Sequence, residues 1–179
     1  MQKENLYDDF EDWEDDANLI DKEDWKGLLQ LREERARSSP EDLCAQQRYG
    51  EALVLNKKYS EAIDFLTPLY RIHYDEGFGI HEIMDALIGL GKTEKDFNWV
   101  TEPKVYRLNK QTLDLCIKTL KGKRKHLSIF NIYETFLYDA DYIAFNEDNL
   151  SEFLLKYPEI FSFIGDRSFP QFLEVKLIK

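Results

Sequence analysis

Residues 49–66 read YGEALVLNKKYSEAIDFL, and this stretch decides the fold of the first half of the chain. Its apolar residues recur at helical spacing on both sides of the Asn-Lys-Lys at its centre, which predicts two helices joined by a tight turn. The small residues Gly50 and Ala62 allow two such helices to approach closely. The stretch therefore predicts an antiparallel helical hairpin, with helices over about 41–55 and 59–73.

The hairpin pattern recurs along the chain. A shift of 34 residues places residues 52–54 (Ala-Leu-Val) on residues 86–88 (Ala-Leu-Ile). The second stretch predicts another hairpin, with helices over 80–90 and 93–100. A helix-turn-helix unit of about 34 residues resembles the tetratricopeptide repeat.

Particular residues carry this resemblance. Gly50 and Ala62 stand where the family has small residues at its helix–helix seam, and large apolar residues follow the family pattern at Tyr49, Leu53 and Leu66. The chain departs from the pattern at Gln46, Met84 and Asp96. The resemblance covers about Asp24–Val100 and implies stacked hairpins whose first helices line a groove for a peptide or helix of another protein. The groove residues that the repeat alignment implies are Arg48, Glu51, Lys58 and Asp85.

A helix over about 24–37 is expected to lead into the hairpins, with Leu28 on its apolar face and Arg32 in solvent. Ser39 is expected to cap the next helix, because Ser is a common N-cap residue and Pro40 suits the first turn. Pro68 removes a backbone donor, which predicts a kink or a break near the end of the helix over 59–73.

Residues 1–21 are predicted to be a mobile arm. More than half of the positions from 4 to 24 are Asp or Glu, and few apolar side chains offset the entropy of ordering them. Tyr7, Phe10 and Trp13 nevertheless recur at every third position. Two interpretations remain open: a solubilising arm whose aromatics pack on the first hairpin, or an arm that folds onto a basic groove of a partner.

Charge divides the chain near residue 100. Residues 1–100 hold 12 Lys and Arg against 24 Asp and Glu, whereas residues 101–179 hold 12 against 11. The first half should therefore repel nucleic acid and anionic lipid and favour basic partners. The chain begins without a signal-peptide pattern and has no apolar run of membrane-spanning length, so a cytoplasmic protein is expected, with no membrane partner. Cys44 and Cys116 are expected to be small apolar core residues.

Residues 101–179 have a different pattern, with helices followed by strands. Helices are predicted over 110–120, 127–137 and about 146–157, and strands over 160–164 and 172–178. Three helices and a closing hairpin resemble a winged-helix domain in the order of their elements. The predicted fold class is mainly α: tetratricopeptide-like hairpins over 22–100, then a small α+β winged-helix-like domain over 101–179.

A basic cluster lies between the first two of these helices. It consists of Lys121, Lys123, Arg124 and Lys125. The cluster is interpreted as an exposed loop or, alternatively, as a phosphate contact. Acidic residues on the predicted third helix (Glu147, Asp148 and Glu152) argue against nucleic acid, because in a winged-helix domain this helix enters the major groove.

Nothing in the sequence has the pattern of an active site or a cofactor site. Residues 90–93 (Leu-Gly-Lys-Thr) resemble the end of a phosphate-binding loop, but the loop's first glycine would fall at Ala86 and no strand precedes it. The metal-capable side chains near the second hairpin have no known ligand spacing; they are His73, Asp75, His81 and Glu82. No enzyme activity, cofactor or metal is therefore expected.

The main functional hypothesis is a non-enzymatic adaptor that binds a peptide or helix of a basic protein partner. One alternative is a regulator that contacts nucleic acid through its winged-helix-like domain. Another is a small acidic chaperone or immunity-type protein that neutralises a basic partner.

Overall fold

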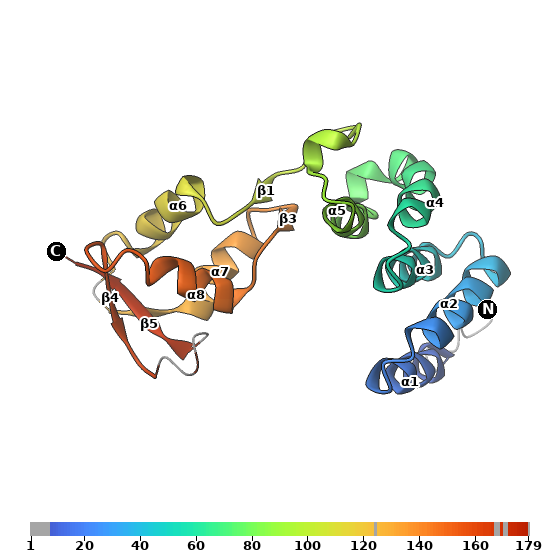
Figure 1. The fold of residues 1–179 in the computed structure, drawn as a ribbon, viewed down its shortest axis with the longest axis horizontal. Coiled ribbons are helices and arrows are strands. Elements are labelled where there is room, and N and C mark those ends of the chain that lie inside the picture. The colour runs from blue at the N-terminus through green and yellow to red at the C-terminus, as the bar shows by residue number, and fades with distance from the viewer. Residues whose placement is uncertain (1–7, 124, 167–168, 170–171, 179) are drawn as a thin grey trace, which may run out of the picture. The chain divides into compact units, whose positions relative to one another are not determined.

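The structure is a computed structural model that describes residues 8–123, 125–166, 169 and 172–178, with side chains from Glu14 onward. It is mainly α-helical, with a small α+β part toward the C-terminus (Figure 1). The chain divides between Val100 and Thr101 into two compact units, here called the N-terminal and the C-terminal unit. No helix in the described part of the chain is long and apolar enough to cross a membrane.

The N-terminal unit is a succession of helices, each packed on the one before it (Figure 1). They are α1 (Asp8–Asp21), α2 (Trp25–Ser38), α3 (Leu43–Leu55), α4 (Tyr59–Ile72) and α5 (Ile80–Gly89). Single turns of 3₁₀-helix follow α4 at Tyr74–Glu76 and α5 at Glu94–Asp96.

The turns after α1, α3 and α5 share one backbone geometry and recur at the period seen in the sequence. Each contains a residue with positive φ: Glu23 (52°), Lys57 (59°) and Gly91 (70°). The residue after it donates its N–H to the carbonyl five positions earlier: Asp24 to Leu19, Lys58 to Leu53 and Lys92 to Leu87. This pattern closes a helix with one left-handed residue. The backbone repeat therefore extends to α1, and α1 with α2 forms a hairpin equivalent to α3 with α4.

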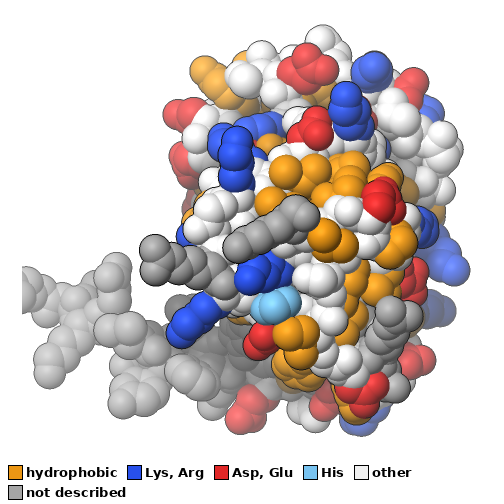
Figure 2. Space-filling view, turned by 90° about the vertical axis from the view of Figure 1, so that its left-hand side faces the viewer, with side chains coloured by type: hydrophobic (Ala, Val, Ile, Leu, Met, Phe, Trp, Pro, Cys, Tyr) orange, Lys and Arg blue, Asp and Glu red, His pale blue; other side chains and the backbone are white. Residues whose placement is uncertain are grey.

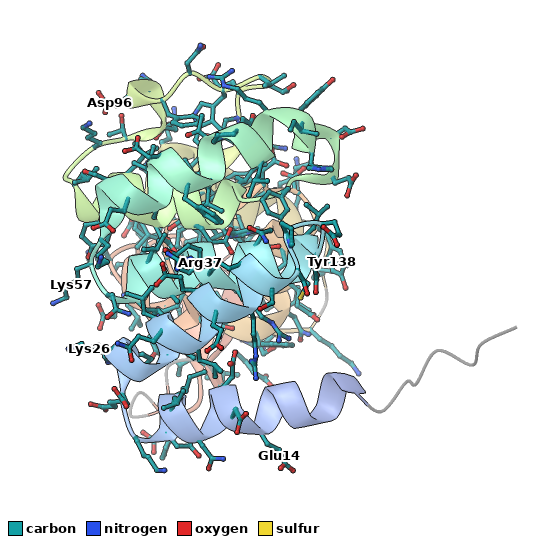
Figure 3. All side chains as sticks on the ribbon, turned by 90° about the vertical axis from the view of Figure 1, so that its right-hand side faces the viewer. Glu14, Lys26, Arg37, Lys57, Asp96 and Tyr138 are labelled. Carbon is teal, nitrogen blue, oxygen red and sulfur yellow. The ribbon has the colours of Figure 1, made fainter. Side chains whose placement is uncertain are left out.

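This arrangement differs from the mobile arm that the composition predicts. The acidic stretch is helical from Asp8 to Asp21 and packs on α2. Glu14 lies on the outer side of α1 (Figure 3), whereas Asp16 is buried. The composition suggests solvation because it does not reveal that one carboxylate has a buried cationic partner. The side chains of Tyr7, Phe10 and Trp13 lie outside the described residues.

The predicted seam between α3 and α4 is confirmed. Gly50 and Ala62 are both buried, and Ala62 packs with Leu53 and Ala86 in one apolar cluster. A Cβ atom added at Gly50 would lie 2.5 Å from Cδ2 of Leu66. The absence of a side chain at position 50 is therefore what lets α4 approach.

Two local predictions in this unit are wrong, and of the two outcomes predicted at Pro68 the break in the helix does not occur. Asp42, not Ser39, caps α3, since its side chain accepts the N–H groups of Cys44 and Ala45. Pro68 does not break α4, which continues to Ile72. Because Pro68 is exposed, water can replace the missing backbone donor there. Cys44 is exposed and is not a core residue.

The prediction of a helix over 93–100 is also wrong, because only the single turn at Glu94–Asp96 is helical. The carboxylate of Asp96 accepts the N–H and the hydroxyl of Thr93 at 2.8 and 3.1 Å, which stabilises a single turn. Phe97 and Trp99 then pack edge-on against Tyr70, with ring centroids at 6.0 and 5.4 Å. These contacts take the place of a second helix after α5.

The C-terminal unit contains α6 (Lys110–Leu120), α7 (Ile129–Leu137) and α8 (Glu147–Leu154). Its antiparallel sheet has the order β2 (Leu127–Ser128), β5 (Glu174–Leu177) and β4 (Phe161–Ile164), with Phe163 opposite Val175. These elements confirm the three predicted helices and the closing hairpin. A short parallel pair, β1 (Val105–Tyr106) with β3 (Tyr142–Ile143), was not predicted, because two-residue strands leave no alternating pattern.

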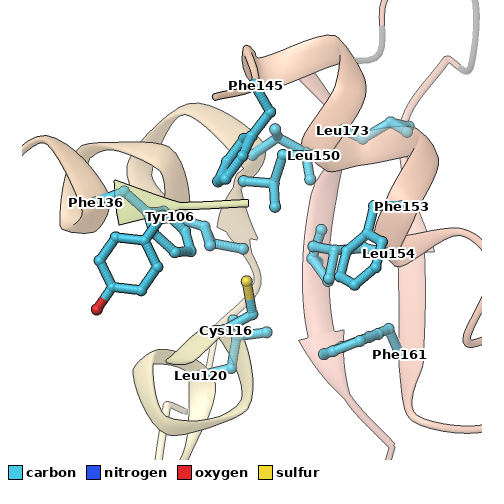
Figure 4. Close-up of a cluster of buried hydrophobic side chains, with 13 residues drawn as sticks. Tyr106, Cys116, Leu120, Phe136, Phe145, Leu150, Phe153, Leu154, Phe161 and Leu173 are labelled. Atoms are coloured by element: carbon cyan, nitrogen blue, oxygen red, sulfur yellow. The ribbon is translucent and has the colours of Figure 1, made fainter. Parts of the chain in front are cut away.

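The core of the C-terminal unit is apolar and rich in aromatic side chains (Figure 4). Phe136 belongs to this core, and its ring centroid lies 5.1 Å from that of Tyr106 and 5.4 Å from that of Phe145. Cys116 is buried in the same core, as predicted, and burial raises the pKa of its thiol to about 12. Such a thiol remains protonated at neutral pH and takes no part in thiolate chemistry.

Asp139 fastens β1 to the end of α7 and makes this junction sensitive to acid. Its carboxylate accepts hydrogen bonds from Lys104 Nζ at 2.7 Å and from the Tyr106 hydroxyl at 2.5 Å. These two donors, Lys104 first, lower the pKa of Asp139 below its ordinary value of 3.8.

A group whose folded-state pKa is lowered stabilises the fold above its unfolded pKa and loses this effect as pH falls through the folded pKa. We therefore expect Asp139→Asn to be less stable than the wild type at pH 7, with the difference shrinking as pH falls below the ordinary pKa of 3.8 and disappearing below the lowered pKa of Asp139. Urea unfolding across this pH range measures it. A difference that persists at low pH would contradict the assignment.

Candidate protein-binding face

The helices α1, α3 and α5 occupy equivalent places in the 34-residue period and expose equivalent positions. The first exposed row is Ala17, Glu51 and Asp85. The second is Ile20, Val54 and Ile88, of which Ile20 and Ile88 are 40% and 44% exposed and Val54 is half-buried. The third is Asp21, Leu55 and Gly89. We call these nine positions the repeat face.

The repeat face is mixed in character. Each helix contributes a position occupied by a β-branched apolar residue, and acidic residues lie one turn away at Glu51 and Asp85. Such a face can bury apolar side chains of a ligand in its centre and pair with cationic ones beside it.

The sequence-derived groove residues are only partly brought together. Glu51 and Asp85 occupy one row of the repeat face, and Arg48 lies one turn before Glu51 on α3. Lys58 does not lie on these helices. It occupies the N-cap position of α4, and its ammonium pairs with Glu61 at 2.8 Å. This hydrogen bond raises the pKa of Lys58, so it is fully charged at neutral pH.

A buried charge network joins α1, α2 and α3. The guanidinium of Arg32 donates through Nε to Asp16 at 2.9 Å and through Nη1 to Glu51 at 2.6 Å. Nη1 also lies 3.1 Å from the carbonyl oxygen of Arg48. Arg35 donates to the other oxygen of Asp16 at 2.9 Å.

Arg32 is therefore not the solvent-exposed residue that helical periodicity predicts, since only 6% of it is exposed. In the 34-residue alignment, positions 16 and 32 correspond to Gly50 and Leu66. The first hairpin thus has an ion pair where the second has an apolar contact. Sequence reasoning missed the pair, although this alignment contains the signal.

A polar contact links α3 to α5. Gln47 donates from Nε2 to Glu82 Oε1 at 3.0 Å. The other oxygen, Oε2, is buried and has no hydrogen-bond partner among the described residues. An uncompensated carboxylate oxygen adds negative potential at this junction.

The basic cluster of residues 121–125 lies in the C-terminal unit. Lys121 and Lys123 are exposed and line an open hollow together with Lys176 of β5. The floor of the hollow is apolar, formed by Leu120, Leu177 and Ile178. Figure 2 shows basic side chains beside a band of apolar ones on this side of the molecule. Lys125 is exposed, and Arg124 lies outside the described residues.

The remaining candidate motifs are residues 90–93, which resemble the end of a phosphate-binding loop, and the metal-capable side chains near α5. Gly91 is the left-handed residue of the turn that ends α5, so residues 90–93 belong to this turn. His73 Nδ1 lies 3.6 Å from Glu76. Within the part of the chain that the structure describes, no group of three or more His, Cys, Asp or Glu side chains could hold a metal ion.

Comparison of the chain with protein-family models, curated proteins and solved structures gave no match.

Proposed function

We propose that this chain is a non-enzymatic adaptor whose repeat face binds a peptide or helix from a basic protein partner. One observation carries the proposal. Three helices related by a 34-residue period have apolar residues at one equivalent position, where Ile20 and Ile88 are exposed and Val54 is half-buried. The core of this unit leaves Ile20 and Ile88 exposed, and unburied apolar surface with a polar border is typical of interaction sites.

The period and the hairpin geometry support a tetratricopeptide-like unit. The seam contact of Gly50 with Leu66 and the recurring turns agree with the resemblance seen in the sequence. In solenoids of this kind, stacked helices create an extended binding surface. The resemblance implies that the first helix of each hairpin faces the ligand, which corresponds to α1, α3 and α5 here.

Charge supports a basic partner. The N-terminal unit has twice as many acidic as basic residues, and three of its acids, Asp21, Glu51 and Asp85, lie on the repeat face. Attraction of this kind accelerates association and weakens at high salt, because the screening length is about 8 Å at 0.15 M ionic strength.

Nucleic-acid binding is a weaker candidate. The order α6, β2, α7, α8, β4, β5 is similar to that of a winged-helix domain. However, α8, which corresponds to the groove-reading helix, begins with Glu147 and Asp148. Acidic groups there would repel phosphates, so we propose that this unit also contacts protein.

The proposal is tested with a phage-displayed peptide library selected on the full chain. The selected peptides should combine apolar residues with Lys or Arg, and Ile88→Glu should lower their affinity at least tenfold. Ile72→Glu on α4 is the matched control, since it changes another exposed isoleucine, and it should leave affinity within twofold. Peptides that bind both variants equally would rule out the repeat face.

A further inference from the structure

Two phenylalanines are exposed beside one hollow in the C-terminal unit. Phe130 of α7 and Phe172, just before β5, are 49% and 70% exposed. Together with Asn146, Glu147 and Asp148 at the start of α8, they line an open hollow. Two large aromatic side chains exposed to about half or more represent apolar area that this unit does not bury.

The border of this hollow is acidic, and the acids are available. The polar groups that cap α8 are satisfied within the chain, because Asn146 accepts the N–H of Asn149 at 2.9 Å and the two residues form a reciprocal cap. Glu147 and Asp148 have no ion-pair partner among the described residues. A cationic group placed in the hollow would therefore meet carboxylates that are not already paired.

We propose that this hollow docks a short protein segment in which an apolar side chain is flanked by Lys or Arg. The apolar side chain packs between Phe130 and Phe172, and the flanking cations pair with Glu147 and Asp148. Aromatic residues in the centre with charged groups at the border are the usual arrangement of a binding hot spot. This surface belongs to the C-terminal unit and does not depend on the repeat face.

The negative charge of Glu147 and Asp148 distinguishes between the kinds of molecule that could occupy the hollow. Nucleic acid would bring phosphates toward two carboxylates, which is unfavourable. An acidic segment would meet the same repulsion. A basic segment gains from both the aromatic contact and the charge, and exposed aromatic side chains that line a hollow can hold an aliphatic or aromatic anchor.

The test uses the full chain carrying Ile88→Glu. This substitution weakens binding at the repeat face, so that peptides bound there do not obscure the result. A phage-displayed random peptide library is selected on it, and fluorescence polarisation measures the affinity of the selected peptides. We expect sequences that combine an apolar residue with Lys or Arg. Phe130→Ser, Phe172→Ser and the double change Glu147→Gln with Asp148→Asn should each weaken binding at least tenfold.

Two changes serve as matched controls. Tyr138→Ser removes an aromatic side chain just after α7 that is 89% exposed, and Glu152→Gln removes an exposed charge of α8. Both should leave affinity within twofold, and circular dichroism should show every variant folded.

Four outcomes would overturn the proposal. The library could yield no binder, or yield binders that the Phe130 and Phe172 variants retain. Light scattering could instead show wild-type dimers that Phe172→Ser abolishes, which would make a second copy the occupant. Duplex DNA binding that the same variants lose would assign the surface to nucleic acid.

Discussion

Replacing Asp16 with Ala is expected to lower the free energy of unfolding of the N-terminal unit by about 3–5 kcal/mol. Asp16 and Arg32 are 4% and 6% exposed, so the substitution removes the buried carboxylate beside a buried guanidinium, which then keeps only the half-exposed carboxylate of Glu51. All three tryptophans, at positions 13, 25 and 99, lie in this unit. Tryptophan fluorescence during urea unfolding therefore reports the change.

The chain itself supplies the matched control for this prediction. The double substitution Asp16→Gly with Arg32→Leu copies the Gly50–Leu66 contact of the next hairpin. Replacing a buried ion pair with well-packed apolar residues is often neutral or stabilising, so the double variant should recover most of the loss. If Asp16→Ala shifts the unfolding midpoint no more than Glu14→Ala, an exposed acid of the same helix, the charge network does not hold α1.

Replacing Phe136 with Ala should destabilise the C-terminal unit by about 3–5 kcal/mol. The ring is fully buried and makes edge-on contacts with Tyr106 and Phe145. Because each unit has its own core, the substitution should affect one unit far more than the other.

The unfolding of each unit can be followed by a separate signal. Circular dichroism should show an early transition in Phe136→Ala, whereas the tryptophan transition, which reports the N-terminal unit, should stay near its wild-type midpoint. Leu137→Ala is the control, since this neighbouring side chain is 55% exposed. A common shift of both transitions would show that the units unfold together.

The parts of the fold that follow from strong periodic patterns were predictable. The hairpin of α3 and α4 has apolar residues at helical spacing and small residues at its seam, so residues 49–66 were sufficient to identify it. The closing strands were predictable because β5 alternates between apolar and polar residues and β4 is a short, mostly apolar run that ends at Gly165. In each case the local pattern and the tertiary packing favour the same structure.

The rest depends on contacts between distant residues. The helix α1 has an acidic sequence, and its packing on α2 depends on Asp16 meeting Arg32, 16 positions away. The segment after α5 has a helical pattern, but Phe97 and Trp99 pack on Tyr70 instead. For the repeat face, the sequence indicated Glu51 and Asp85. The row of Ile20, Val54 and Ile88 includes α1, and the equivalence of α1 with α3 and α5 follows from the turn geometry in the structure.

Isoleucine methyl resonances of the full chain test the central claim most directly. The protein is labelled at isoleucine δ1 methyl groups and titrated with a peptide selected on the wild type. Ile20 and Ile88 lie on the repeat face, whereas Ile72 of α4 and Ile164 of β4 are exposed elsewhere. We expect Ile20 and Ile88 to shift together along one binding curve while Ile72 and Ile164 stay in place. Shifts at Ile72 or Ile164 without shifts at Ile20 and Ile88 would contradict a ligand on the repeat face.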